Sequence, residues 1–172
     1  NTAPTADFES IDPFNEAGSD KGVNLRLDAR PSTDPDGPDD PLSYKWFDNE
    51  VQISTAQVTD YKFSLGWHDL KLIVLDGNNT PSEPRAMRFL VNDTLAPQLS
   101  GIPTNISKVS GSQAGAIISY PVPLTWDVVN GSGTPLATRG TGSIFPIGRT
   151  TVTFRAIDAS GNITTATMDV NV

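Results

Sequence analysis

Short stretches of alternating hydrophobic and polar residues recur along the chain. A period of two places every second side chain on the same face of a β-strand. In the first half the hydrophobic positions of four such stretches are Val23, Leu25, Leu27 and Ala29; Leu42, Tyr44 and Trp46; Leu70, Leu72 and Val74; and Met87, Phe89 and Val91. Turn-forming residues separate these stretches, most densely at 31–41, so we predict the antiparallel strands of a β-sandwich.

The second half repeats the alternation up to its last residue. The hydrophobic positions are Val152, Phe154 and Ala156, and then Ala166, Met168, Val170 and Val172. The segment Asp-Ala-Ser-Gly-Asn at 158–162 lies between them and predicts the turn of a C-terminal β-hairpin. We find no hydrophobic run of helical period that is long enough for a stable helix, so the chain is predicted to be all-β.

The alternation stops at 92–97, Asn-Asp-Thr-Leu-Ala-Pro, which we interpret as a short linker. A chain of 172 residues is long enough for two small domains. We therefore predict two tandem β-sandwich domains, at 1–92 and 93–172, and we expect Trp46, Phe154 and Met168 to lie in their cores.

The amino-acid composition excludes several kinds of functional site. The chain has no cysteine, which excludes disulfides, thiolate metal sites and cysteine nucleophiles. No apolar run approaches the roughly 20 residues of a membrane span, so we expect no membrane insertion. The chain begins at Asn1 without an initiator methionine or a signal-like segment, so we expect it to be a piece of a longer protein. We also expect this piece to be monomeric.

The negative charge is concentrated in the first half. Residues up to Asp93 include 17 acidic and 8 basic side chains, a net charge of −9, whereas the remainder has 3 acidic and 4 basic. Such a surface disfavours nucleic acid and anionic membranes as partners, because both are polyanions. It suits a hard cation such as calcium, although a solvated acidic surface is the favoured explanation for most of these residues.

Four segments of the first half form a recognisable set of motifs. They are Asn-Thr-Ala-Pro-Thr-Ala at 1–6, Leu-Asp-Ala-Arg-Pro-Ser-Thr-Asp-Pro-Asp-Gly at 27–37, Leu-Ser-Tyr-Lys-Trp at 42–46, and Gly-Trp-His-Asp-Leu-Lys-Leu-Ile-Val-Leu-Asp-Gly at 66–77. Through them, residues 1–92 resemble a PKD domain (polycystic kidney disease-type repeat).

The second half has its own set of motifs. They are Asp-Thr-Leu-Ala-Pro at 93–97, Tyr-Pro-Val-Pro at 120–123 before Asp127, Gly-Ser-Ile-Phe-Pro-Ile-Gly-Arg-Thr-Thr-Val-Thr-Phe at 142–154, and the turn at 158–162. Through them, residues 93–172 resemble a HYR (hyalin repeat) domain. Many members of that family have cysteines where this chain has Phe154 and Ala166, and a large and a small apolar side chain can fill that space without a bridge.

Both resemblances imply immunoglobulin-like β-sandwiches that serve as accessory modules of extracellular proteins. In bacteria such modules often accompany peptidase, glycoside hydrolase or adhesin domains. The leading hypothesis is therefore a non-catalytic spacer or presentation tandem in a secreted or cell-surface protein, whose partners are the neighbouring domains of that protein. The alternative is an adhesive or substrate-binding module for insoluble protein, polysaccharide or a cell surface.

The resemblance to PKD domains also implies a calcium site. The first-strand Asn, a D-x-D pair and the Asp that ends a late strand can converge at one pole of such a sandwich. This implies Asn1, Asp34, Asp36 and Asp76 as ligands, with Thr2 and Asp40 as lesser candidates. Carboxylates and a tight Gly turn suit Ca²⁺, but Asp, Pro and Gly also form turns without any metal.

The second half offers a weaker set of oxygen ligands. Its members are Asp93, Asp127, Asp158 and Asn162. Asp158 before Ser-Gly-Asn is explained more simply as an Asx-type turn, so we do not assign this set as a metal site.

Exposed aromatic residues are candidates for surface binding, because flat rings bind sugars and prolines. Trp46 alternates with Tyr44 and Leu42 and is predicted to be the core Trp of a strand. Trp67 and Trp126 are possible surface-binding residues, although core or rim packing is favoured for each. His68 is the only histidine, and we find no nucleophile elbow or phosphate-binding Gly loop, so the chain is not predicted to be an enzyme.

Overall fold

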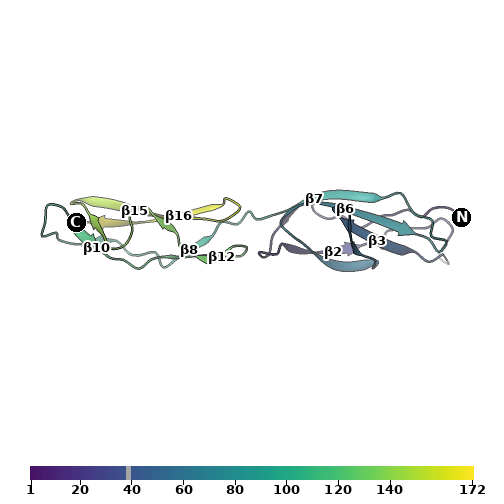
Figure 1. Ribbon diagram of the computed structural model, residues 1–172, viewed down its shortest axis with the longest axis horizontal. Coiled ribbons are helices and arrows are strands. Elements are labelled where there is room, and N and C mark those ends of the chain that lie inside the picture. The colour runs from purple at the N-terminus through teal and green to yellow at the C-terminus, as the bar shows by residue number, and fades with distance from the viewer. Residues whose placement is uncertain (38–39) are drawn as a thin grey trace. The chain divides into compact units, whose positions relative to one another are not determined.

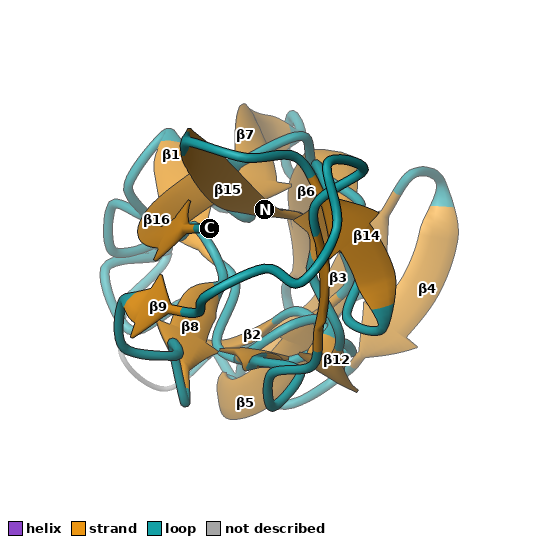
Figure 2. Cartoon of the chain, turned by 90° about the vertical axis from the view of Figure 1, so that its left-hand side faces the viewer, coloured by secondary structure: helices purple, strands orange, loops and turns teal. Residues whose placement is uncertain are grey.

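The chain forms two compact units, at 1–93 and 94–172, in a computed structural model that describes residues 1–37 and 40–172. Every regular element in these ranges is a β-strand, and the ribbon contains no helix (Figure 2). Accordingly, the described part of the chain has no helix that could cross a membrane. The turn-rich segment predicted at 31–41 includes residues 38 and 39, which lie outside the described residues.

The first unit is a sandwich of two sheets. Its strands are β1 (Phe14–Glu16), β2 (Val23–Asp28), β3 (Ser43–Asp48), β4 (Val51–Ser54), β5 (Val58–Phe63), β6 (Gly66–Leu75) and β7 (Arg85–Asn92). One sheet has the order β1-β7-β6-β3-β4, and β2 pairs with β5 in the other. Figure 1 shows β2 across the unit from β6 and β7.

The core of the first unit lies between these sheets. Trp46 and Phe63 are fully buried, and Phe8 packs 5.4 Å from the Trp46 ring, measured between centroids. The other buried apolar residues on strands are Leu27, Tyr44, Leu70, Leu72, Val74, Phe89 and Val91. They occupy the faces that the period-two pattern predicts, because alternate side chains of a strand point to opposite faces.

The second unit consists of nine strands of two to nine residues. They are β8 (Gln98–Ser100), β9 (Ile106–Ser107), β10 (Ala116–Ile118), β11 (Leu124–Asp127), β12 (Gly131–Gly133), β13 (Leu136–Ala137), β14 (Ser143–Phe145), β15 (Arg149–Ile157) and β16 (Ile163–Asn171). The sheets have the orders β13-β15-β16-β9, β12-β11-β8 and β10-β14. Figure 1 shows β15 and β16 on one side of the unit and β8 and β12 on the other.

The predicted C-terminal hairpin is confirmed. Strands β15 and β16 pair antiparallel from Arg149↔Asn171 to Ile157↔Ile163. Phe154 pairs directly with Ala166, so the large and the small side chain occupy opposite positions on neighbouring strands. Phe154 and Met168 are buried, as predicted. The all-β class and the sandwich architecture predicted from the sequence are likewise confirmed.

Removal of the Phe154 ring is expected to destabilise the second unit by about 3–5 kcal/mol, because a large-to-small change in a core leaves a cavity. Denaturant unfolding of the full chain measures this. Ile157→Ala provides the comparison, since Ile157 is on the same strand but 49% exposed, and its cost should stay below that of Phe154→Ala. Equal costs would contradict the core position of Phe154.

A buried carboxylate makes the first unit sensitive to acid. Asp28 is 1% exposed, and Arg30 Nε donates to both of its carboxylate oxygens at 2.9 and 3.0 Å. The hydrogen bonds from the Arg30 side chain outweigh burial, which acts in the opposite direction, and lower the pKa of Asp28 from 3.8 to about 2. The ionised form therefore stabilises the folded state above pH 3.8, and this contribution is lost as the pH falls through about 2.

We expect Asp28→Asn to lower the melting temperature of the first unit at pH 7 and to lower it less as the pH approaches 2. Calorimetry of the full chain between pH 7 and pH 2 follows this difference. Asp20→Asn, at an exposed turn residue, should leave the profile unchanged. A difference between Asp28→Asn and the original chain that is constant over the whole range would contradict the role of Asp28 ionisation.

Candidate metal site and exposed aromatic residues

The D-x-D-G segment forms a local turn. The backbone N–H of Asp36 donates to Asp34 Oδ1 at 2.8 Å, and the N–H of Gly37 donates to the Asp34 carbonyl oxygen at 3.4 Å. Gly37 has a φ of 106°, a left-handed conformation that favours glycine. The hydrogen bonds of this turn use Oδ1 and the carbonyl oxygen of Asp34, but not its second carboxylate oxygen, Oδ2.

Asp76 follows β6 and is 3% exposed. Its Oδ1 accepts hydrogen bonds from the backbone N–H groups of Asn78 and Thr80, both at 2.8 Å, and Asn1 Nδ2 donates to its Oδ2 at 2.9 Å. Desolvation raises the pKa of Asp76, but the hydrogen bonds from Thr80, Asn1 and Asn78 together lower it below its usual value. Asp76 is therefore a buried carboxylate that stays ionised at neutral pH.

Asp34, Asp40 and Asp76 form a three-carboxylate cluster. Each offers an oxygen, and these oxygens all lie within 4.8 Å of one another. Asp40 is held by the backbone N–H of Gly77, which donates to its Oδ1 at 2.7 Å. Asp34 Oδ2 is buried and has no hydrogen-bond partner among the described residues. A buried anionic oxygen without a donor is costly, and a cation would satisfy it.

The cluster differs in one member from the predicted ligand set. Asp34 and Asp76 belong to it, and Asn1 adjoins it through Asp76. Asp36 does not belong to it, and its Oδ2 accepts a hydrogen bond from the backbone N–H of Thr2 at 2.5 Å. Asp40, a lesser candidate in the sequence, takes its place. The hydrogen bond from Gly77, 37 residues away, holds Asp40 in the cluster, and no local sequence motif specifies this long-range contact.

In the second unit, the acidic candidates form turns. Asp127 Oδ1 accepts from the backbone N–H groups of Val129 and Asn130, both at 2.8 Å. Asp158 accepts from the backbone N–H and the side-chain amide of Asn162, also at 2.8 Å. The bond from Val129, two residues on, is of the Asx type at Asp127, and the Asp158 carboxylate closes its turn through the residue four positions on. Asp93 is buried at the end of the first unit.

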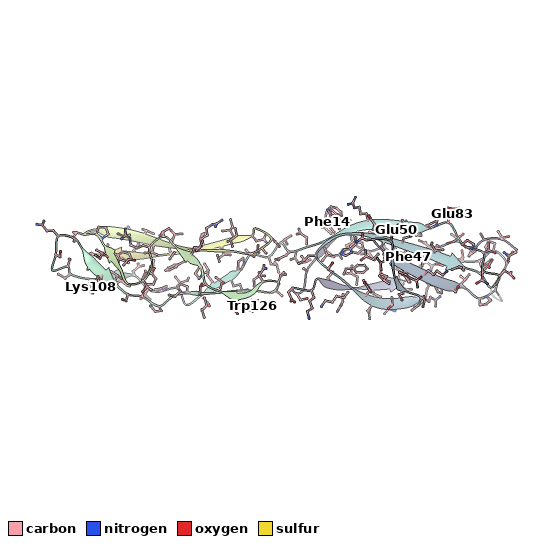
Figure 3. The ribbon with its side chains drawn as sticks, in the orientation of Figure 1. Phe14, Phe47, Glu50, Glu83, Lys108 and Trp126 are labelled. Atoms are coloured by element: carbon pink, nitrogen blue, oxygen red, sulfur yellow. The ribbon has the colours of Figure 1, made fainter. Side chains whose placement is uncertain are left out.

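The three Trp residues divide into one core and two surface residues. Trp46 is fully buried, and its indole N–H donates to the Ala56 carbonyl oxygen at 2.9 Å. Trp67 is 52% exposed and Trp126 is 53% exposed, which excludes core packing for both. Figure 3 labels Trp126 on its unit. Whether either residue binds a ligand stays a prediction.

His68 has a structural environment. It is 4% exposed, its Nδ1 lies 2.8 and 3.0 Å from the carboxylate oxygens of Asp48, and its Nε2 lies 2.9 Å from the Ser64 carbonyl oxygen. The ring also stacks on Phe89 with centroids 5.3 Å apart. Both nitrogens thus have protein partners, so neither is available to a substrate.

Solved structures with similar folds include three from bacteria. The fibronectin(III)-like modules of CbhA from Clostridium thermocellum are 14% identical, with a TM-score of 0.42 over 52% of this chain and 98% of that one. The ZmpB structure from Clostridium perfringens, an M60 catalytic domain with two CBM51 domains, is 16% identical, with a TM-score of 0.31 over 100% of this chain and 16% of that one. SGBP-B from Bacteroides ovatus, solved with a mixed-linkage heptasaccharide, is 14% identical, with a TM-score of 0.37 over 99% and 48%.

No curated protein matches the chain by sequence. The chain spans less than half of the SGBP-B and ZmpB structures. A family model does match the second unit, and it confirms the resemblance inferred from the motifs at 93–97, 142–154 and 158–162. Residues 92–172 match the HYR domain family.

Proposed function

We propose that the chain is a non-catalytic accessory tandem of a larger secreted or cell-surface protein. A PKD-like module, at 1–92, precedes the HYR module and together they space and present the neighbouring domains of the parent protein. Calcium binding at the three-carboxylate cluster stiffens the first module. The HYR match supports an extracellular accessory role.

The environment of His68 supports a role without catalysis. General acid–base work requires a side chain within reach of the substrate proton. The single histidine of the chain is buried, with both ring nitrogens next to protein oxygens. The interiors of both modules are filled by apolar side chains, which suits a scaffold.

The calcium proposal depends chiefly on one observation, the buried Asp34 Oδ2 without a donor. Ca²⁺ takes six to eight oxygen ligands, including carboxylates, amide carbonyls and water. Asp34, Asp40 and Asp76 supply three carboxylates, and the Asn1 side chain is held next to them by its hydrogen bond to Asp76. The ion would neutralise three negative charges that repel one another and would join the first residue to two loops.

Calcium should raise the melting temperature of the first module. At free Ca²⁺ about 100 times the dissociation constant, binding stabilises the folded state by about 2.7 kcal/mol. For a domain of this size each kcal/mol corresponds to roughly 4–8 °C. Calorimetry of the full chain, with Ca²⁺ and with a chelator, measures the shift.

Asp34→Ala and Asp40→Ala should abolish the shift, and their melting temperature in chelator should equal or exceed that of the original chain, because charge repulsion is relieved. Asp20→Asn removes a distant exposed carboxylate and should leave the shift intact. Identical melting of the original chain in both buffers would refute the site.

A tandem of separate modules also predicts a protease-sensitive boundary. Limited proteolysis should cut first within 93–97, where no strand is present, and leave two resistant fragments that mass spectrometry can assign. First cuts inside β3, β6, β15 or β16, with no fragment ending near this segment, would argue against two independent modules.

A further inference from the structure

A row of exposed side chains crosses three neighbouring strands of the first module. Phe14 on β1 and Trp67 on β6 both pair in register with Leu90 on β7. Residues paired across a sheet share one face, so the three side chains lie side by side. Phe14 is 71% exposed and Trp67 is 52% exposed, while Leu90 between them is half-buried. Figure 3 labels Phe14 at this surface.

This face is not used by the core. The core residues Phe89 and Val91 alternate with Leu90 along β7 and point to the opposite side of the sheet. Phe14 and Trp67 are separated by two strand spacings, about 10 Å between their Cα atoms. Two aromatic rings with an aliphatic side chain between them thus form an elongated apolar strip across the sheet, from β6 to the edge strand β1.

Polar pairs border the strip on both sides. On one side, Asp69 pairs in register with Arg88, their side chains are 3.5 Å apart, and both are more than half exposed. The Arg88 guanidinium also lies over the Trp67 ring, 4.7 Å from its centroid. On the other side, the exposed residues Glu16 and Asn92 pair in register. The border therefore offers hydrogen-bond donors and acceptors together.

We propose that the Phe14–Leu90–Trp67 row binds an extended, uncharged, β-linked polysaccharide. A sugar ring has an apolar face of C–H groups and a rim of hydroxyls, so it can stack on an aromatic ring while its hydroxyls reach flanking polar groups. Successive rings of one chain would lie along the strip. Arg88 would donate to hydroxyl oxygens, and Asp69 and Glu16 would accept from hydroxyl groups.

The negative charge of the first module favours uncharged over anionic polysaccharides. The border has two carboxylates and one guanidinium, and the residues up to Asp93 have a net charge of −9. An anionic polysaccharide would be repelled, whereas an uncharged one meets no such barrier. This binding role goes beyond the spacer role and does not depend on the calcium site.

Sedimentation of the full chain with microcrystalline cellulose and with chitin tests the proposal. We expect retention on at least one of these uncharged polymers and little on alginate gel. Phe14→Ala and Trp67→Ala should each weaken the affinity about tenfold, equivalent to about 1.4 kcal/mol, because each removes one of the two stacking rings. Trp67→Tyr, which keeps an aromatic ring, should retain most of the affinity.

Val51→Ala is the control, because Val51 is an exposed apolar residue of the same sheet, 66% exposed on β4 and outside the row. It should bind like the original chain. The melting temperature of the first module should not change in the Phe14 or Trp67 variants, and retention should persist in chelator, which separates this proposal from the calcium site.

Several outcomes would overturn the proposal. They are retention on neither uncharged polymer, retention unaffected by Phe14→Ala and Trp67→Ala, and an equal loss in Val51→Ala. Binding to collagen fibrils alone, with loss in Trp67→Ala, would assign the row to a protein ligand instead. A dimer that dissociates in Trp67→Ala would show that a second copy of the chain covers it.

Discussion

Each module depends on a layer of apolar side chains packed between its sheets. In the first, the fully buried Trp46 satisfies its one polar atom by donating to Ala56 and packs against Phe8. In the second, Phe154 packs edge-to-face on Tyr120, with ring centroids 5.7 Å apart. With no cysteine in the chain, this burial has no covalent support. Because the cores supply this burial, the loops and the outward faces of the sheets can contain polar and exposed aromatic residues.

Both modules begin a core strand in the same way. Gly22 precedes β2 and Gly115 precedes β10, with φ values of 91° and 103°. A Cβ at these positions would lie 1.8 and 1.9 Å from the carbonyl oxygens of Phe63 and Phe145. Both Phe side chains are fully buried. In each module the residue before the strand lies so close to the backbone of a core Phe that it has no room for a side chain. Only glycine fits there.

The two proposed properties of the first module use different parts of it. The carboxylate cluster is built from loops, and its members are fixed mainly by backbone N–H donors, as at Asp76 and Asp40. The Phe14–Leu90–Trp67 row is built on paired strands, where the register holds the side chains. Stiffening by an ion and adhesion through a flat face can therefore coexist, because neither needs the side chains of the other.

The sequence by itself determined the strands and much of the core, because alternation of faces is a local property of an extended chain. Trp46, Phe154 and Met168 are buried as their positions in the pattern predict. The resemblance of the first half to PKD domains had also indicated Asp34 and Asp76, two of the three carboxylates that the structure brings together. Only the tertiary structure brings Asp40, and not Asp36, next to Asp34 and Asp76, with Gly77 holding Asp40 and Thr2 holding Asp36 through hydrogen bonds that join distant segments. Likewise, only strand register brings Phe14 beside Leu90 and Trp67, because pairing depends on contacts that no local pattern specifies.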